Sequence, residues 1–337
     1  MKRRSLLAIA GGSVLTLALS ACGGGSSDPG ASAGAGSSSA DGGSKAGGLI
    51  TIIVNDPSNP YWAAEGDSAK AAAEQLGYKA TVAAHRGDTN TESQLVDTAI
   101  SNGSVALLLD PANADGSVGA VQKADAAGIP VFLINAEINK TGIAKAQLVS
   151  NNAQGAALGA QQWAQLVGQD GQYAELLGAP SDNNAATRSN GYKTVLSQYP
   201  GLQKVAEQVA NWDRTEGHDK MQAMLQANPG INAVISGNDE MALGAIAALQ
   251  ESGQIGQMKA IGGFDGSPDA VDAIKAGTLS YTVLQPVVTF SQEAVKQADS
   301  FLKTGKTGVS EEKQAFDCVL ITKDNVDKYT APFTMSQ

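Results

Sequence analysis

The feature that most constrains the fold is a regular alternation of short apolar runs with longer amphipathic segments. Leu49–Val54 is continuous, apolar and rich in β-branched residues, which is typical of a strand buried on both faces. The segment from Pro60 to Leu76 has helical spacing and is closed by Gly77. This pair of patterns returns at intervals of about 25 to 30 residues, as expected for βαβ units around a parallel sheet.

The alternation runs through one series before Asn151 and restarts after it. Predicted strands lie at 49–54, 79–84, 105–109, 129–134, 172–177, 204–209, 233–235, 259–262 and 280–284. Predicted helices lie at 60–76, 90–100, 117–127, 152–167, 183–198, 214–227 and 240–252. Two series of similar size, in a folded region of about 290 residues, predict an α/β fold with two doubly wound parallel-sheet lobes.

The N-terminal segment predicts an exported protein on a lipid anchor. A signal peptide of residues 1–21 would have a basic start, an apolar run over 6–19 and small residues before the cleavage site. The tetrad LSAC (19–22) resembles the lipobox of bacterial lipoproteins, which implies a diacylglyceryl group on Cys22. Residues 22–48 are almost wholly Gly, Ser and Ala and predict a flexible tether. The alternative is an ordinary secretory signal, with Cys22 a coincidence.

The charge argues against two kinds of partner. The net charge is −10, and removal of a leader that holds basic but no acidic residues makes the protein more acidic. Such a charge disfavours nucleic acid and anionic membrane surfaces, so membrane attachment would depend on the lipid alone. No further apolar run of about 18 residues follows the leader. With Cys22 acylated, Cys318 has no partner for an intramolecular disulfide.

Polar and aromatic side chains gather directly after the predicted strands, where ligands bind in doubly wound sheets. Amides and carboxylates form paired hydrogen bonds to vicinal hydroxyl groups, and aromatic rings can pack against the C–H faces of a sugar. The alternative is that Asp and Asn at these places are only helix N-caps, a role that suits Asp239 and Ser267. The N-cap explanation does not account for Trp62, Trp212 and Arg188. The set therefore predicts a small-molecule cleft.

Five segments then carry a recognisable order of motifs. They are VNDPSNPYW (54–62), ALLLDPAN (106–113), NDEMALGAIAALQ (238–250), IGGFDGSPDAVDAI (261–274) and TVLQP (282–286). Together, from Leu49 to about Thr322, they resemble the ribose-binding-protein family of type I periplasmic binding proteins, which serve sugar ABC importers. The resemblance implies two lobes joined by a three-strand hinge that close on the ligand. The implied lobes are 49–150 plus 286–313, and 151–285 plus 314–337.

The ligand-binding positions of that family fall on ten residues of this chain. They are Asn59, Tyr61, Trp62, Asp110, Asn135, Arg188, Trp212, Asn238, Asp265 and, at the hinge, Gln285. The resemblance implies that Tyr61 and Trp62 form one wall of the cleft and that Trp212 forms the opposite wall. Arg188 would bind two hydroxyl groups at once, as its planar guanidinium allows, and Asp265 would accept from a neighbouring hydroxyl.

This chain departs from the ribose pattern at two places. Many ribose-type members carry an Asp-Arg pair after the fourth strand, where this chain has Asn135 and Ala136, and Asp110 stands where they often have Asn. The site thus loses a bidentate clamp and gains an acceptor. That change favours a pentitol or tetritol, while a pentose stays open. A sugar acid is disfavoured because Asp110 and Asp265 would repel it.

The sequence therefore predicts an extracytoplasmic solute-binding lipoprotein of a carbohydrate ABC importer. We expect a monomer that binds a small neutral sugar or sugar alcohol, with the permease subunits of the importer as its partners. The alternative is a sugar-sensing protein that docks to a chemoreceptor or a signalling kinase. A sugar-responsive repressor would need an N-terminal helix-turn-helix, and the signal and tether occupy that place.

No enzyme activity, cofactor or metal is expected. The sequence has neither a Gly-x-Ser-x-Gly nucleophile elbow nor a Gly-x-Gly-x-x-Gly motif after its first strand. His85 and His218 are the two histidines, and neither has a Cys or His partner at the spacing of metal ligands.

Overall fold

The structure is a computed structural model, which describes residues 47–330 and 332–336. The predicted signal peptide, Cys22 and nearly all of the predicted tether lie outside these residues. Within the described ranges, no helix combines the length and apolar character needed to cross a membrane.

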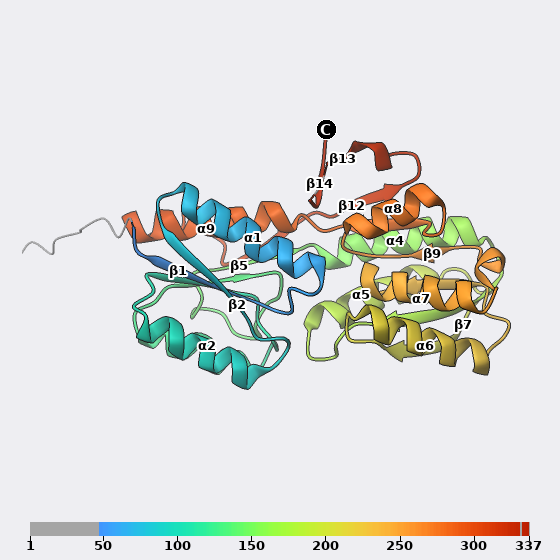
Figure 1. The fold of residues 1–337 in the computed structure, drawn as a ribbon, viewed down its shortest axis with the longest axis horizontal. Helices are drawn as coiled ribbons and strands as arrows, with labels where there is room; N and C mark the ends of the chain where they lie inside the picture. The colour runs from blue at the N-terminus through green and yellow to red at the C-terminus, as the bar shows by residue number, and fades with distance from the viewer. Residues whose placement is uncertain (1–46, 331, 337) are drawn as a thin grey trace, which may run out of the picture. The chain divides into compact units, whose positions relative to one another are not determined.

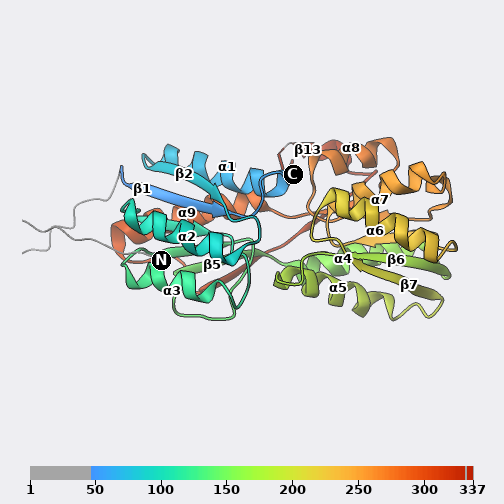
Figure 2. The same cartoon turned by 60° about the horizontal axis from the view of Figure 1, so that its bottom comes forward.

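The first sheet contains the strands of the first predicted series and one strand from near the C-terminus (Figure 1). In spatial order its strands are β11 (Lys313–Phe316), β5 (Ala146–Ser150), β4 (Val131–Ile134), β3 (Ala106–Leu109), β1 (Leu49–Val54) and β2 (Lys79–Ala84). All neighbouring pairs are parallel. The helices on one face are α1 (Pro60–Gln75) and α9 (Val287–Thr304), and those on the other are α2 (Thr89–Ser101) and α3 (Val118–Ala126) (Figure 2). The central strands serve both faces, because Ile52 packs in the core with α1 and Ile53 in the core with α2 and α3.

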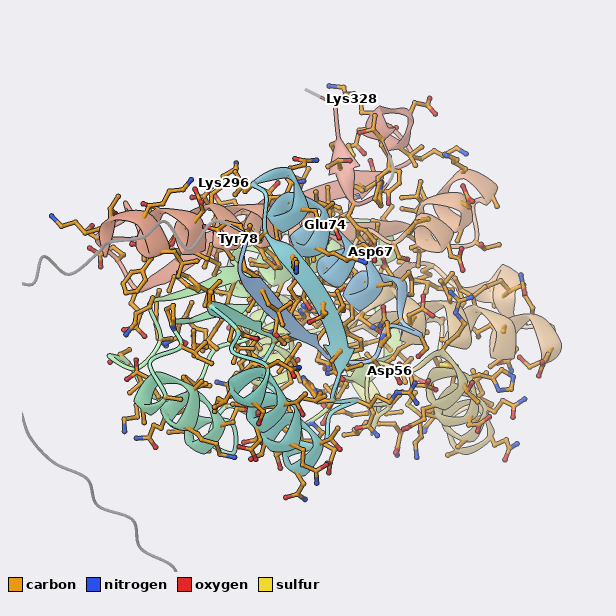
Figure 3. All side chains as sticks on the ribbon, turned by 60° about the vertical axis from the view of Figure 1, so that its left-hand side comes forward. Asp56, Asp67, Glu74, Tyr78, Lys296 and Lys328 are labelled. Carbon is orange, nitrogen blue, oxygen red and sulfur yellow. The ribbon has the colours of Figure 1, made fainter. Side chains whose placement is uncertain are left out.

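Helix α1 is positioned by its first turn. Asn59 Oδ1 accepts a hydrogen bond from the Tyr61 N–H at 2.9 Å, and Pro60 occupies the first helical position, where its fixed φ suits a helix start. Asp67 and Glu74 lie on the exposed side of the helix (Figure 3). The helix therefore begins directly beyond β1 and places Tyr61 at the carboxyl edge of the sheet.

The second sheet repeats this plan. In spatial order its strands are β12 (Val319–Thr322), β10 (Tyr281–Leu284), β9 (Ile261–Gly262), β8 (Ala233–Ser236), β6 (Gly171–Leu177) and β7 (Leu202–Val209). Only β12 runs antiparallel to its neighbour, β10. The helices on one face are α4 (Asn152–Val167) and α5 (Asn183–Leu196), and those on the other are α6 (Arg214–Ala227), α7 (Asp239–Glu251) and α8 (Pro268–Ala276) (Figure 2). The predicted α/β class with two doubly wound sheets is confirmed.

The chain passes between the two sheets three times: from β5 into α4, from β10 into α9 and from β11 into β12. Cys318 lies on the third passage, where it is buried, and burial raises the pKa of its thiol to about 12. The division into lobes at residues 150, 285 and 313 remains a prediction. The strand pairing places residues 314–316 with the first sheet rather than the second.

Strand β5 is not predicted from the sequence, because Gln147 interrupts its apolar residues. The Gln147 side chain is buried and fully bonded: Nε2 donates to Lys140 O at 3.1 Å and to Glu312 Oε1 at 2.8 Å. Its Oε1 accepts from the Ile138 N–H at 3.2 Å. A polar side chain with these partners is compatible with a buried strand, and only the folded chain supplies the partners.

The segment after β12 forms a small additional sheet that packs against the main core. It contains the 3₁₀ helix η2 (Val326–Lys328) and a hairpin of β13 (Tyr329–Thr330) and β14 (Thr334–Met335) (Figure 1). The exposed Lys328 marks the start of this hairpin in Figure 3. The sequence analysis assigns no element to this segment.

Candidate ligand-binding site

Two of the predicted site residues are helix N-caps whose amide groups also reach further. Asn59 caps α1 and Asn238 caps α7, each through its Oδ1 atom. The Nδ2 groups of both residues donate to the main-chain oxygen of Trp212, at 3.5 Å and 3.2 Å respectively. Asn59 follows β1 of the first sheet and Asn238 follows β8 of the second, so this carbonyl joins side chains from both sheets. In each of these residues the cap uses only the Oδ1 atom of the side-chain amide, and the Nδ2 group is bonded to Trp212 instead.

A chain of hydrogen bonds runs from the first sheet to the second through Gln285. Asn135 Nδ2 donates to Asp110 Oδ2 at 3.1 Å. The Tyr61 hydroxyl lies 3.0 Å from Asn135 Oδ1 and 3.2 Å from Gln285 Oε1, and its single proton can serve one of them at a time. Gln285 Nε2 then donates to Asp265 Oδ1 at 2.7 Å. These residues are thus connected, and Gln285 stands at the passage from β10 into α9.

The guanidinium of Arg188 is fixed by groups of the second sheet. Its Nε donates to Asn152 Oδ1 and its Nη1 to Gly237 O, both at 2.8 Å. Nη1 also lies 3.5 Å from Asp265 Oδ1, and Cζ lies 5.1 Å from the ring centroid of Trp212. Arg188 is 3% exposed, so its charge is desolvated and depends on these partners. The guanidinium is therefore already oriented before a ligand binds.

Three predicted site residues adopt left-handed backbone conformations. The φ angles are 65° at Asn135, 66° at Trp212 and 129° at Asp265. Non-glycine residues rarely occupy this region, and a tryptophan there is an outlier that the surrounding structure must enforce. Such strain concentrates at functional sites, and here it occurs at three members of one predicted set.

Two buried indole groups face the same region without a hydrogen-bond partner. Trp62 and Trp212 are 7% and 5% exposed, and within the described residues neither Nε1–H makes a well-formed hydrogen bond. Each lies near a carboxyl group whose pKa it helps to lower, Trp62 near Asp110 and Trp212 near Asp182. A buried N–H without an acceptor costs roughly 1–3 kcal/mol, so each indole calls for a partner. Each pair offers one donor and one acceptor close together.

These side chains line a narrow cavity of about 20 Å³. It is lined by Asn59, Tyr61, Trp62, Asn135, Asp182, Asn184, Arg188, Trp212, Asn238, Asp265 and Gln285. Nine of the ten predicted residues belong to this lining. The tenth, Asp110, lies behind Asn135 and borders a larger outer cavity of about 320 Å³ that opens to solvent. The rule that ligands bind beyond the carboxyl ends of the strands in doubly wound sheets, called the strand-end rule below, therefore located one common site. The binding function of this site remains a prediction.

Residues 50–307 match the family described as periplasmic binding protein domain. The chain belongs to the periplasmic binding protein family. It is 51% identical over 282 residues to the D-apiose import binding protein of Actinobacillus succinogenes, covering 83% of this chain and 90% of that protein. It is 31% identical to the ribose import binding protein of Salmonella typhimurium, covering 81% of this chain and 90% of that one.

A solved structure is also similar: the solute-binding protein of an ABC transporter from Bacillus halodurans with bound myo-inositol. It has a TM-score of 0.78 and 27% identity, and the match covers 85% of this chain and 98% of that one. The predicted resemblance is confirmed: this is a sugar ABC transporter solute-binding protein of type I periplasmic fold. The family consists of solute-binding proteins that act outside the cytoplasm and are not enzymes, in agreement with the sequence analysis.

Two residues of the binding protein's cavity were missed from the sequence. Asp182 caps α5 by accepting from the Asn184 N–H at 2.8 Å. Asn184 Nδ2 donates to Asn135 O at 3.2 Å, and Asn184 Oδ1 accepts from Asn152 Nδ2 at 2.9 Å. Asp182 follows β6, so the strand-end rule could have found it. Four loop residues separate Asp182 from Leu177, the last residue of β6, so its position at a strand end is not evident from the sequence.

Three carboxyl groups around the cavity have a raised pKa. Burial raises the pKa of Asp265 to about 7, although the Arg188 charge and the Gln285 amide act in the opposite direction. Burial also raises the pKa of Asp110 and of Asp182. Removal from water disfavours the ionised form of each carboxyl group. The lining thus contains two acidic side chains, Asp182 and Asp265, and Arg188 is the one cation in it within the described residues.

Proposed function

We propose that this binding protein carries a small neutral polyhydroxylated ligand of four or five carbons, a pentose or a short sugar alcohol, to a carbohydrate ABC permease. The supporting observation is the hydrogen-bonded chain from Asp110 to Asp265 beside two buried indoles that have no partner among the described residues. A hydroxyl group both donates and accepts. We expect one ligand hydroxyl to accept from the Trp62 indole and donate to Asp110, and another to do the same at Trp212 and Asp182.

The inner cavity supports a small ligand because it is narrow. Its volume of about 20 Å³ lies far below the range of roughly 300–1,000 Å³ typical of drug-sized ligands. The side chains on both sides already bond to one another across it, as Asn59 does to Trp212. A ligand therefore has to separate these contacts, and a four- or five-carbon ligand requires less displacement than a disaccharide.

The charge of the site supports a neutral ligand. Asp182 and Asp265 line the inner cavity and Asp110 stands directly behind it, against the single guanidinium of Arg188. Arg188 Nε and Nη1 bond to Asn152 and Gly237, so within the described residues the two N–H groups of Nη2 are left to donate to ligand hydroxyl groups. A sugar acid would meet three buried acidic groups and is expected to bind poorly.

The names of the relatives suggest an order of affinity among the candidate ligands. The relative that is 51% identical is named for D-apiose, a branched five-carbon sugar, and the relative that is 31% identical is named for ribose. We therefore place D-apiose first, D-ribose second, and erythritol and xylitol third.

A thermal-shift series with these four compounds and D-gluconate tests the proposal. A ligand at a hundred times its Kd stabilises the native state by about 2.7 kcal/mol, which shifts Tm by several degrees in a protein of this size. We expect the largest shift from D-apiose and none from D-gluconate. Mass spectrometry of the recovered ligand should show it unchanged. The largest shift from D-gluconate, or a chemically altered sugar, would contradict the proposal.

We also propose that the mature protein is anchored to the extracytoplasmic face of the cell membrane by a lipid on Cys22, a residue outside the described part. The supporting observation is the tetrad LSAC (19–22) followed by a Gly/Ser/Ala-rich segment. Cys22→Ser should move the protein from the detergent phase to the aqueous phase in a Triton X-114 partition. Cys318→Ser is the matched control, since Cys318 is buried and should leave partitioning unchanged. Membrane retention of the Cys22→Ser protein would refute the anchor.

A further inference from the structure

The C-terminal hairpin contacts the ligand site from outside the two sheets. It spans Tyr329 to Met335 and follows β12, the last strand of the second sheet. Ser336 N–H donates to Lys328 O at 2.8 Å and closes the base of the hairpin. None of these residues lines the cavity. Two of them, Tyr329 and Phe333, nevertheless touch segments that do.

The first contact holds the hairpin to the loop that carries Asp265. The Tyr329 hydroxyl donates to Gly266 O at 2.9 Å and accepts from the Phe333 N–H at 3.0 Å. Both hydrogen-bonding functions of this hydroxyl are thus used. Gly266 directly follows Asp265, and burial raises the pKa of Tyr329 to about 12, so the donor keeps its proton at physiological pH.

The second contact reaches the opposite side of the site. The ring of Phe333 packs edge-to-face on the ring of Tyr61, with centroids 5.9 Å apart and planes at 87°. Both side chains are buried, Phe333 at 2% exposure and Tyr61 at 3%. Aromatic pairs favour this geometry because the positive edge of one ring meets the negative face of the other. The contact therefore fixes the direction of the Tyr61 hydroxyl, which bonds to Asn135 and Gln285.

The backbone of Phe333 is strained in order to make this contact. Its φ angle is 52°, in the left-handed region that bulky side chains avoid. A glycine or asparagine at this place would relieve the strain, but it would remove the ring from Tyr61. A strained aromatic residue held between two parts of one site indicates that its side chain is needed there.

We propose that Phe333 is a positioning residue for ligand binding: the C-terminal hairpin ties the Asp265–Gly266 loop of the second sheet to Tyr61 of the first. The hairpin lies beyond the third passage between the sheets, so it adds a non-covalent fourth connection at the site itself. Its effect on affinity rests on the proposed function. Its effect on the order of Tyr61 does not.

The test compares Phe333→Ala with Phe301→Ala in the mature protein. Phe301 makes a similar edge-to-face pair with Phe132, at 6.3 Å and 75°, in the first sheet away from the cavity. Phe333→Leu keeps apolar volume but removes the ring edge. Calorimetry with D-apiose measures affinity, the Tm of the ligand-free proteins measures folding, and hydrogen–deuterium exchange of the ligand-free proteins measures the order of segments 59–66 and 264–267.

We expect Phe333→Ala to weaken D-apiose binding about tenfold and to speed exchange in both segments. Phe333→Leu should recover the Tm but only part of the affinity, whereas Phe301→Ala should lower the Tm and leave Kd and the two segments unchanged. Unaltered exchange at 59–66 in Phe333→Ala overturns the inference, as does an affinity loss of equal size in Phe301→Ala. If wild-type protein binds no sugar of the series, the proposed function fails, and the exchange comparison still decides the inference.

Discussion

The two walls of the cavity are built to the same plan but differ in how firmly they are held. In each wall an indole lies beside a buried carboxyl group: Trp62 with Asp110 at the first sheet, and Trp212 with Asp182 at the second. The second wall also contains Arg188, whose Cζ lies 3.9 Å from the ring centroid of Phe264 and whose nitrogen atoms bond to fixed acceptors.

Among the residues that the structure describes, the first wall has no buried cation like Arg188. Glu65 lies behind this wall, fully buried in α1, and within the described residues neither of its carboxyl oxygens has a hydrogen-bond partner. Burial raises the pKa of Glu65, and the nearby Asp110 charge raises it further. The first wall thus holds two buried carboxyl groups, Asp110 and Glu65, without a cation beside them among the described residues, whereas the second sets Arg188 against Asp182 and Asp265. We therefore expect the second wall to supply most of the binding free energy and the first wall to determine which ligand is preferred.

The largest effect should come from Asp265→Ala in the second wall. This change removes an acceptor for ligand and leaves both Gln285 Nε2 and Arg188 with a lost partner in a buried site. We expect the affinity to fall roughly a hundredfold, or about 2.7 kcal/mol. Calorimetry measures it, and circular dichroism should show the empty protein folded. A Kd within twofold of wild type would show that Asp265 is misplaced in the site.

The two tryptophans give a direct comparison of the walls. Trp212→Phe should weaken binding about tenfold and Trp62→Phe about threefold, because only Trp212 also packs on Arg188. The double variant should lose the ligand-induced fluorescence change. Trp163 is the remaining indole, and its Nε1–H is bonded to Val234 O at 2.8 Å inside the second sheet. An undiminished signal from the double variant would place the binding event elsewhere.

A smaller effect is expected from Asp110→Asn in the first wall. The change restores the residue that ribose-type members often carry and keeps an acceptor for Asn135 Nδ2. We expect D-apiose affinity to change about threefold to fivefold and the ratio of D-ribose to D-apiose affinity to rise. Asp56→Asn, in the outer cavity, is the control and should change neither. A change in Kd as large as that expected for Asp265→Ala would contradict the expectation that the second wall supplies most of the affinity.

The last prediction is a pH dependence of the stability of the ligand-free protein. The pKa of Asp265 is about 7 in the folded protein and lies near 3.9 when unfolded, so the folded state holds more protons between these values. The contribution of Asp265 to stability is therefore fully present below about pH 4 and is lost as pH rises through 7, at roughly 1 kcal/mol per pH unit. Burial lowers the pKa of His85, which opposes this trend at the acidic end. Asp265→Asn should flatten the curve of Tm against pH, and an unchanged slope would contradict the assignment.

The sequence predicts this fold and site well wherever the signal is local. The strand-end rule brings together residues as distant as Asn59 and Asp265, since parallel strands end at one edge. It fails where the deciding partner is remote. Gln147 looks unsuited to a strand until Glu312 is placed beside it, and Phe333 has no local pattern that relates it to Tyr61. Such contacts join parts of the chain that only the completed fold brings together.

The buried Cys318 has a practical consequence for detecting ligands. Its thiol is 4% exposed and burial holds its pKa at about 12, so it should resist alkylating dyes at neutral pH. A protein that starts after the tether and carries one added cysteine at the exposed Ser58 would then accept a single fluorophore, on the rim of the outer cavity. Rearrangement of that rim around a sugar would become a change in emission, and the protein would serve as a reagentless optical sensor.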